Sequence, residues 1–247
     1  MFALDPSRGL MSVGPVFKRI LLKLSGEALG PGGGIDPAIL GSIADQLKEV
    51  SDLGVQVGVV VGGGNFFRGL THATGEGMNR STADTIGMLA TAMNCLAVQD
   101  ALERRGQGAT TLTAIPLGAA AQSFSQRGAL AALAAGQIVL LAGGTGNPYF
   151  TTDTAAALRA LEIGADVLLK ATKVDGIYNA DPVLHPDAVR YDTLTYEQVL
   201  QQRLGVMDLT AITLCRDNKL PLVVFDLTRP GNIRRVVLGE AVGSRVQ

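Results

Sequence analysis

The sequence predicts an α/β protein with a mostly parallel central sheet sandwiched by helices. Short apolar runs alternate with amphipathic helical patterns along the chain. Several of these runs lead directly into glycine-rich turns. A hydrophobic content of 47% and a mean hydropathy of +0.28 indicate extensive burial. No apolar run approaches the roughly 18 residues that span a membrane, so this hydrophobicity is expected in a core or in subunit contacts.

Charge and cysteine content narrow the classes of function. The net charge of −1 argues against a nucleic-acid partner, although a local cationic pocket can still bind small anions. Cys95 and Cys215 are too few for a zinc site or a disulfide framework. We expect both to be buried thiols of a cytoplasmic protein. His72 and His185 lack partners at metal-binding spacing, and no protein metal site is predicted.

The chain divides into a tail and one domain. Residues 1–17 lack the pattern of a signal peptide and are predicted to form a flexible N-terminal tail. Residues 18–247 show no repeat and no linker, which favours a single domain. Within it we expect two lobes sharing one sheet, divided near residue 165.

The first predicted strand, Arg19–Ser25, alternates apolar residues. It ends in Lys23, Leu24, Ser25 and Gly26. A lysine near the exit of a buried strand, followed by Ser-Gly, suits a phosphate contact. The alternative is a surface lysine at a sheet edge.

A helix and a second strand come next. Asp36 and Pro37 are placed as N-cap and first residue of a helix that Gly54 ends. The strand Val55–Val61 follows and leads into a glycine triplet, at residues 62–64, that allows an anion to approach closely. Arg68 adds a planar donor group suited to phosphate. The alternative is a tight turn with a solvated arginine.

A long helix is predicted over Ser81–Arg105, with an apolar stripe that serves packing or subunit contact. Asp84 lies in its first turn, either as an acid favoured by the helix dipole or as an acceptor for a ribose hydroxyl. The strand Thr110–Ala114 and the helix Gln126–Leu133 follow.

The most informative stretch is the loop between the strand Ile138–Gly143 and the next helix. Small residues and the helix dipole make such a turn an anion site. We expect Thr152 or Asp153 to be the N-cap. The loop offers hydroxyl donors from three threonines: Thr145, Thr151 and Thr152. An ordinary strand-to-helix loop remains the alternative.

The last third begins with the strand Asp166–Ala171 and a turn at Asp175-Gly176, followed by an irregular segment up to Tyr196. Four further elements are predicted to complete the sheet and its cover: helices at Tyr196–Arg203 and Asp208–Asn218, a strand at Leu222–Asp226 and a helix near Asn232–Leu238.

No G-x-x-x-x-G-K-[ST] motif is present, so several strand exits must share the work of binding phosphates. Six motifs stand in order along the chain: Lys23-Leu24-Ser25-Gly26, Val61-Gly62-Gly63-Gly64-Asn65, Gly77-Met78-Asn79-Arg80 with Asp84, Gly146 to Asp153, Lys173 to Tyr178 with Asp181-Pro182, and Val206-Met207-Asp208. Taken together, they resemble the amino acid kinase superfamily and, within it, the bacterial UMP kinase family. The resemblance runs from about Lys18 to the C-terminus.

The resemblance implies reversible transfer of the ATP γ-phosphoryl group to UMP, giving UDP and ADP, with Mg²⁺ accompanying ATP. It implies a cytoplasmic homohexamer in de novo pyrimidine nucleotide synthesis, with the helix over 81–105 in the subunit contact and UTP as inhibitor. The segment 30–34 looks shorter than in enterobacterial members, where this region takes part in activation by GTP. GTP is therefore an effector to be tested, and activation by GTP is not inferred for this chain from the enterobacterial members.

The resemblance also assigns site residues. Lys23 would bridge phosphoryl oxygens, Asp153 would orient Lys23 and not act as a base, and Asp208 would help to organise the phosphate site. The implied catalytic set is Lys23, Arg68 and Asp153. The implied ATP set is Lys23, Leu24, Ser25, Gly26, Gly64, Arg68, Thr172, Tyr178 and Asp181. The implied UMP set is Gly63, Asp84, Thr145, Gly146, Asn147, Pro148, Tyr149, Phe150, Thr151 and Thr152.

Three alternatives stay open at this point. A superfamily kinase for aspartate, glutamate or carbamate would leave Asp84 without a ribose to bind. A non-catalytic nucleotide-binding storage or regulatory protein of similar fold would be expected to depart from the pattern at Lys23 or Asp153, and both residues are present. A core-forming α/β domain without a site would not explain why Lys, Arg, Gly and Thr cluster at the strand ends.

Overall fold

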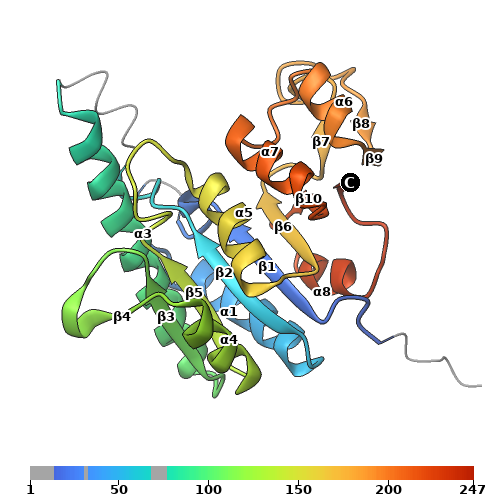
Figure 1. Ribbon diagram of the computed structural model, residues 1–247. Helices are drawn as coiled ribbons and strands as arrows, with labels where there is room; N and C mark the ends of the chain where they lie inside the picture. The colour runs from blue at the N-terminus through green and yellow to red at the C-terminus, as the bar shows by residue number, and fades with distance from the viewer. Residues whose placement is uncertain (1–13, 31–32, 68–76) are drawn as a thin grey trace, which may run out of the picture.

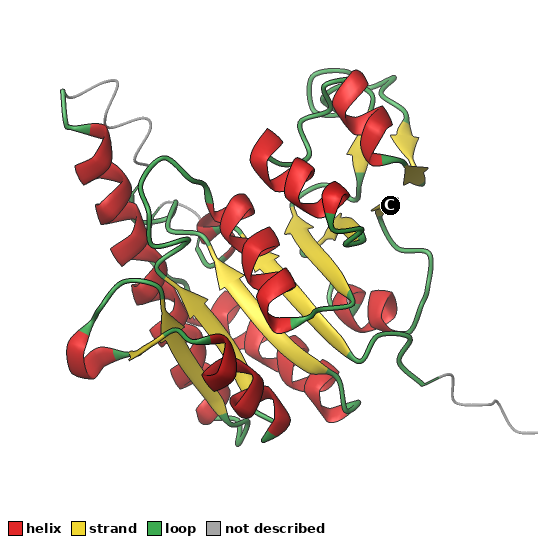
Figure 2. Cartoon of the chain, viewed as in Figure 1, coloured by secondary structure: helices red, strands yellow, loops and turns green. Residues whose placement is uncertain are grey.

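The computed structural model describes residues 14–30, 33–67 and 77–247. Its centre is a nine-stranded sheet in the order β4-β3-β5-β2-β1-β6-β10-β11-β9, with helices on both faces (Figures 1 and 2). All neighbouring strands are parallel except β10 and β11, which are antiparallel. The predicted, mostly parallel α/β architecture is confirmed.

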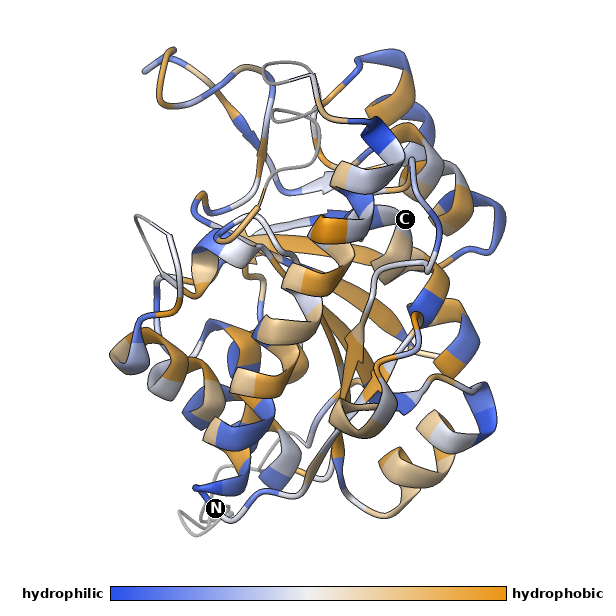
Figure 3. Ribbon diagram, turned by 90° about the vertical axis from the view of Figure 1, so that its left-hand side faces the viewer, coloured by the Kyte–Doolittle hydropathy of each residue, from blue (hydrophilic) through white to orange (hydrophobic). Residues whose placement is uncertain are grey.

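The central strands are buried on both faces, which explains their continuous apolar runs. From one edge of the sheet to the other, the nine strands are β4 (Gln122–Ser123), β3 (Ala109–Thr113), β5 (Ile138–Ala142), β2 (Gln56–Val61), β1 (Arg19–Leu24), β6 (Val167–Thr172), β10 (Leu222–Asp226), β11 (Ser244–Val246) and β9 (Thr193–Leu194). Their interior appears as a band of hydrophobic colour in Figure 3.

Two layers of helices complete the core. One apolar cluster joins the sheet to α1 (Pro37–Asp52), α3 (Arg80–Glu103) and α8 (Asn232–Val237). A second cluster joins the other face to α4 (Gln126–Ala134), α5 (Thr152–Ile163), α6 (Tyr196–Gln201) and α7 (Leu209–Asp217). Among the described residues, no helix combines the length and apolar character that crossing a membrane requires.

Sequence patterns located the main elements, but they missed the shortest ones. The irregular segment before Tyr196 contains a hairpin of β7 (Ile177–Tyr178) and β8 (Arg190–Tyr191), followed by β9. The short strands β4 and β11 and the 3-10 turns Gly26–Ala28 and Gly118–Ala120 were also missed. Elements of two or three residues carry no periodicity that a sequence can reveal. The predicted tail over 1–17 lies almost wholly outside the described residues.

Candidate functional site

Two lysines and one aspartate meet at the carboxyl edge of the sheet. Lys23 of β1 and Lys170 of β6 lie opposite each other in register. Because side chains alternate along a strand, both project to the face that α5 covers. Asp153, in the first turn of α5, lies 2.9 Å from Lys23 Nζ and 2.7 Å from Lys170 Nζ. Lys23 and Asp153 are therefore brought together as predicted, whereas the part of Lys170 was not foreseen.

Electrostatics keep this cluster charged. Burial acts to raise the pKa of Asp153, but the charges of Lys23 and Lys170 outweigh it and hold the pKa below its ordinary value. Burial lowers the pKa of Lys170, with Asp153 opposing that shift and Lys23 reinforcing it. Lys23 reaches Oδ1 of Asp153 as an ion pair outside hydrogen-bond alignment. An ionised, doubly paired carboxylate is a poor proton acceptor, so the geometry suits a residue that positions lysines.

The glycines after β1 and β2 allow the two strand exits to touch. A Cβ on Gly26 would lie 2.6 Å from Gly64 N and 2.8 Å from Gly62 O. A Cβ on Gly63 would lie 2.7 Å from the carbonyl oxygen of Gly87 in α3. Sequence reasoning attributed these glycines to anion approach, whereas here they are required first for packing between the loops and α3.

Buried hydrogen bonds fasten both glycine-rich loops to α3. Asn94, fully buried, donates to Gly62 O at 2.7 Å and exchanges amide hydrogen bonds with Asn65 at 2.7 and 3.0 Å. Thr91 accepts a hydrogen bond of 2.8 Å from Gly143 N, at the exit of β5. These residues are components of the site that sequence analysis missed. Polar residues within the apolar stripe of a helix were the available signal.

A cavity of about 140 Å³ opens between α3 and the loop before α5. It is lined by twelve residues: Gly63, Phe67, Asp84, Gly87, Met88, Thr91, Gly144, Thr145, Asn147, Phe150, Thr151 and Thr152. Seven of the ten predicted UMP residues are among them. The other three, Gly146, Pro148 and Tyr149, belong to the same loop but do not line the cavity. We refer to it as the acceptor cavity.

Asp84 anchors this loop to α3. Its carboxylate accepts hydrogen bonds from Arg80 Nε at 2.8 and 2.9 Å and from Tyr149 N at 2.8 Å. Tyr149 has a φ of 70°, in the left-handed region that non-glycine residues rarely adopt. The bond to Asp84 helps to hold that conformation. An ionised carboxylate has about four acceptor sites, so Asp84 retains acceptor capacity toward the cavity.

The three threonine hydroxyls of the loop have different tasks. The N-cap of α5 is Thr151, not Thr152 or Asp153 as predicted: its Oγ1 accepts from Asp153 N and Thr154 N at 3.0 and 3.3 Å. The same hydroxyl donates to Asp208, the N-cap of α7. Thr145 hydrogen-bonds within its own loop. Of the three, only Thr152 has a hydroxyl with no hydrogen bond to another described residue, and it lines the cavity.

A wider cavity of about 720 Å³ lies on the other side of the lysine pair. Lys170, Thr172, Tyr178 and Asp181 are among the residues that line it. Tyr178 donates to Asp175 Oδ1 at 2.5 Å, and this hydrogen bond raises the tyrosine pKa. Thr172 donates to Val174 O at 2.6 Å. We call this space the donor cavity.

The remaining predicted residues fall into four groups. Leu24 is fully buried and its carbonyl accepts from Gly62 N, so its side chain belongs to the core. Gly26 and Gly64 lie in the packed loops described above. Ser25 lines a third cavity, beside α1. Arg68 lies outside the described residues.

The described residues contain no group of three or more His, Cys, Asp or Glu side chains that could hold a metal ion. Mg²⁺ is commonly bound through one or two carboxylates together with phosphate oxygens. The buried Oδ1 of Asp153 has no aligned hydrogen bond. This oxygen therefore fits the role of a single protein ligand to an ion that phosphate oxygens bind.

The family model described as "Amino acid kinase family" matches residues 18–226. The chain belongs to this family. It is 56% identical to the uridylate kinase of Vibrio cholerae over 94% of this chain and 96% of that protein. Among solved structures, it is similar to the UMP kinase of Bacillus anthracis, with 39% identity, a TM-score of 0.90 and coverage of 94% and 96%. The uridylate kinase of Archaeoglobus fulgidus matches at 31% identity and a TM-score of 0.72, with coverage of 92% and 99%.

These matches confirm the predicted family, the α/β fold and the phosphotransferase class. Each of these three relatives matches at least 92% of this chain, so the aligned region includes both cavities and the lysine–aspartate cluster. The cluster also lies between the cavities, because Lys170 lines the donor cavity while Thr152, the neighbour of Asp153, lines the acceptor cavity.

Proposed function

We propose that the protein is a UMP kinase that reversibly transfers the γ-phosphoryl group of ATP to UMP, giving UDP and ADP. The observation that carries this proposal is the position of Lys23, Asp153 and Lys170 between two separate cavities. Two polyanions must be held in line with their charge neutralised, and phosphoryl transfer needs little covalent help beyond that. Two lysines held by one carboxylate supply that charge.

Substrates are assigned to the cavities by their linings. UMP occupies the acceptor cavity, with Asp84 accepting from a ribose hydroxyl and the N-terminus of α5 facing the phosphate. ATP occupies the donor cavity, where the Tyr178 ring packs beside the base and Thr172 and Asp181 hold the nucleotide. Arg68 adds charge at the phosphates. We accordingly divide the domain near residue 165 into an acceptor lobe and an ATP lobe.

Asp153 would help to hold the Mg²⁺ that accompanies ATP. When bound, such an ion would supply positive charge that neutralises the phosphates. Asp153 also keeps Lys23 and Lys170 pointing at the space between the nucleotides. It does not remove a proton, because the acceptor phosphate is already anionic.

Assembly and regulation follow from the family resemblance. We propose that the protein is a cytoplasmic homohexamer that acts in de novo pyrimidine synthesis. The exposed side chains of Leu89 (43%) and Met93 (51%) on α3 support a subunit contact along this helix. UTP inhibits by overlapping the UMP position, and GTP is tested as an effector. Light scattering of the intact protein checks the assembly. A monomeric state would contradict it.

The activity is tested by ADP release from ATP with UMP, CMP, dUMP, aspartate, glutamate or carbamate as acceptor, with and without UTP or GTP. UMP should give by far the fastest release. ATP binding without turnover would favour a storage protein, and turnover of a carboxylate substrate would favour another kinase of the family. Asp84→Asn should chiefly raise the KM for UMP. A change confined to the KM for ATP would contradict the ribose assignment.

A further inference from the structure

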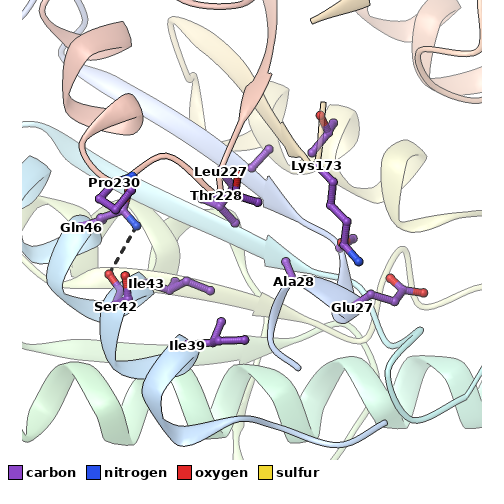
Figure 4. A pocket seen from close by; sticks show the side chains of 13 residues that line it. Glu27, Ala28, Ile39, Ser42, Ile43, Gln46, Lys173, Leu227, Thr228 and Pro230 are labelled. Carbon is purple, nitrogen blue, oxygen red and sulfur yellow. Dashed lines mark hydrogen bonds between the residues drawn. The ribbon is translucent and has the colours of Figure 1, made fainter. Parts of the chain in front are cut away.

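A third cavity lies on the α1 side of the sheet and holds none of the paired lysine–aspartate residues. Its volume is about 350 Å³, within the range of small-molecule sites. Its walls come from the exits of β1, β6 and β10 and from one side of α1 (Figure 4). Ser25 and Thr172 border it, so it adjoins the nucleotide site. It is nevertheless separate from the acceptor and donor cavities, sharing only Thr172 with the latter.

The lining is chiefly apolar. Ile39 and Ile43 of α1 face Leu227, which follows β10 (Figure 4). Ala28, Ala171 and Pro230 complete the apolar wall. A surface of this composition favours burial of a hydrocarbon or aromatic group. The preferred ligand therefore has an apolar body small enough for about 350 Å³.

One cation of this lining, Lys173, has no counterion among the residues that the structure describes. Lys173, directly after β6, is exposed and lines the cavity. It forms no ion pair or hydrogen bond with any residue that the structure describes, whereas the Lys23 and Lys170 ammonium groups share Asp153. Glu27 is the acidic residue of the lining, and its carboxylate is packed toward Gly64: a Cβ placed on Gly64 would lie 2.4 Å from its Oε1.

Three uncharged polar side chains of the lining, those of Thr172, Thr228 and Gln46, already have hydrogen-bond partners within the protein. Thr172 donates to Val174 O, and Thr228 donates to Asp226 Oδ1 at 2.7 Å. Gln46 accepts from Gly231 N and donates weakly to Ser42 O at 3.5 Å, the bond drawn in Figure 4. Lys173 is thus the strongest polar group that a ligand could engage.

We propose that this cavity is a binding site for a small amphipathic anion, distinct from the sites for UMP and ATP. An apolar or aromatic body would occupy the space between α1 and Leu227, and a carboxylate would pair with Lys173. Such a ligand would also lie beside Ser25, which follows β1, and Thr172, the last residue of β6.

The test is calorimetric titration of the intact protein with 2-naphthoate and with its neutral analogue 2-naphthylmethanol. Saturating UMP and a non-hydrolysable ATP analogue are present, so that both nucleotide sites are filled. We expect one site per chain and about tenfold tighter binding of 2-naphthoate, the size of one charge-assisted contact. Loss of binding when both nucleotides are present would overturn the proposal, because the probe would then belong to a nucleotide site.

Three variants sharpen the result. Lys173→Met should make the two probes bind equally, whereas Lys48→Met, on α1 outside the cavity, should preserve the tenfold preference. Ser42→Trp places an indole at the exposed rim of the cavity and should block both probes. Circular dichroism and thermal melting verify folding of each variant. Unchanged binding in a folded Ser42→Trp protein, or an unchanged preference in Lys173→Met, would refute the site.

Discussion

The acceptor and donor cavities differ in how their walls are held. On the acceptor side, two glycine-rich loops are fastened to α3 by the buried side chains of Thr91 and Asn94. The donor side is five times larger, at about 720 Å³ against about 140 Å³. Its wall is a two-residue-strand hairpin with Val183 and Leu184 exposed at 80% and 72%. Buried hydrogen bonds preorganise one wall, whereas the other can adjust to its ligand.

The shared lysine–aspartate cluster should show the largest effect, because both sides depend on it. Asp153→Asn keeps the shape of the side chain but removes the carboxylate that Lys23 and Lys170 share. Loss of one preorganised electrostatic group typically lowers kcat about 10²–10³-fold. Steady-state rates with UMP and ATP measure this loss.

An exposed acid provides the control for that variant. Asp100→Asn removes a surface pair with Arg104 on α3, which is expected to be nearly neutral. A rate within a few-fold of the parent in folded Asp153→Asn would show that the cluster is not central to turnover.

The second-largest effect should come from removing the buried hydrogen bonds that Asn94 makes on the acceptor side. Asn94→Leu leaves Gly62 O and Asn65 without their buried partner, which costs about 2 kcal/mol in the free energy of unfolding. The displaced glycine loop should also raise the KM for UMP more than the KM for ATP. Urea denaturation and initial rates test both effects.

Gln99→Met on the same helix is the matched comparison, since Gln99 makes only an exposed hydrogen bond to Glu103. It should change neither stability nor KM appreciably. Equal shifts in both KM values for Asn94→Leu would remove the claimed distinction between the two sides.

A moderate effect is expected in the pH dependence of kcat. Because the pKa of Lys170 lies below its ordinary value of 10.5, Lys170 loses its proton and its charge as the pH rises through that lowered value. The rate should therefore fall on the alkaline side. Lys170→Arg keeps a charge throughout this range and should move the alkaline fall to higher pH. Identical profiles for parent and variant would assign the fall to another group.

The smallest effect is expected on the donor side. Tyr178→Phe deletes a hydroxyl whose partner, Asp175, is half-buried at 41% side-chain exposure, and leaves the ring in place. The KM for ATP should change by less than about threefold, in line with one partly exposed hydrogen bond. If Tyr178→Phe disturbed ATP binding more than Asn94→Leu disturbed UMP binding, the ranking of the two walls would be reversed.

Sequence reasoning succeeded where a pattern is local. Composition and spacing were sufficient to predict the strands β1, β2, β5 and β6 and the loop before α5. Lys23 and Asp153 were found through motifs. Lys170 was overlooked because a lone lysine in an apolar strand looks like a surface position until its neighbouring strand is known. A signal existed, since Lys23 and Lys170 occupy similar places near the ends of their strands.

Tertiary contacts account for the other gaps. The amide pair of Asn65 and Asn94 joins residues 29 positions apart, and no periodicity predicts such a partnership. The choice of Thr151 as N-cap depends on Asp208, which lies in another segment of the fold. The requirement for glycine at position 63 comes from the backbone of α3. Each of these features is fixed only when separate elements pack.

The pairing of Lys23 with Lys170 across neighbouring strands constrains how the sequence can drift. With Asp153 gone, two ammonium groups would face each other with little solvent to screen them. Substitution of Asp153 should therefore be tolerated only after one of the two lysines has been replaced. Across related sequences, a change at Lys23 or Lys170 should precede a change at Asp153, and reconstruction of ancestral sequences can test this order.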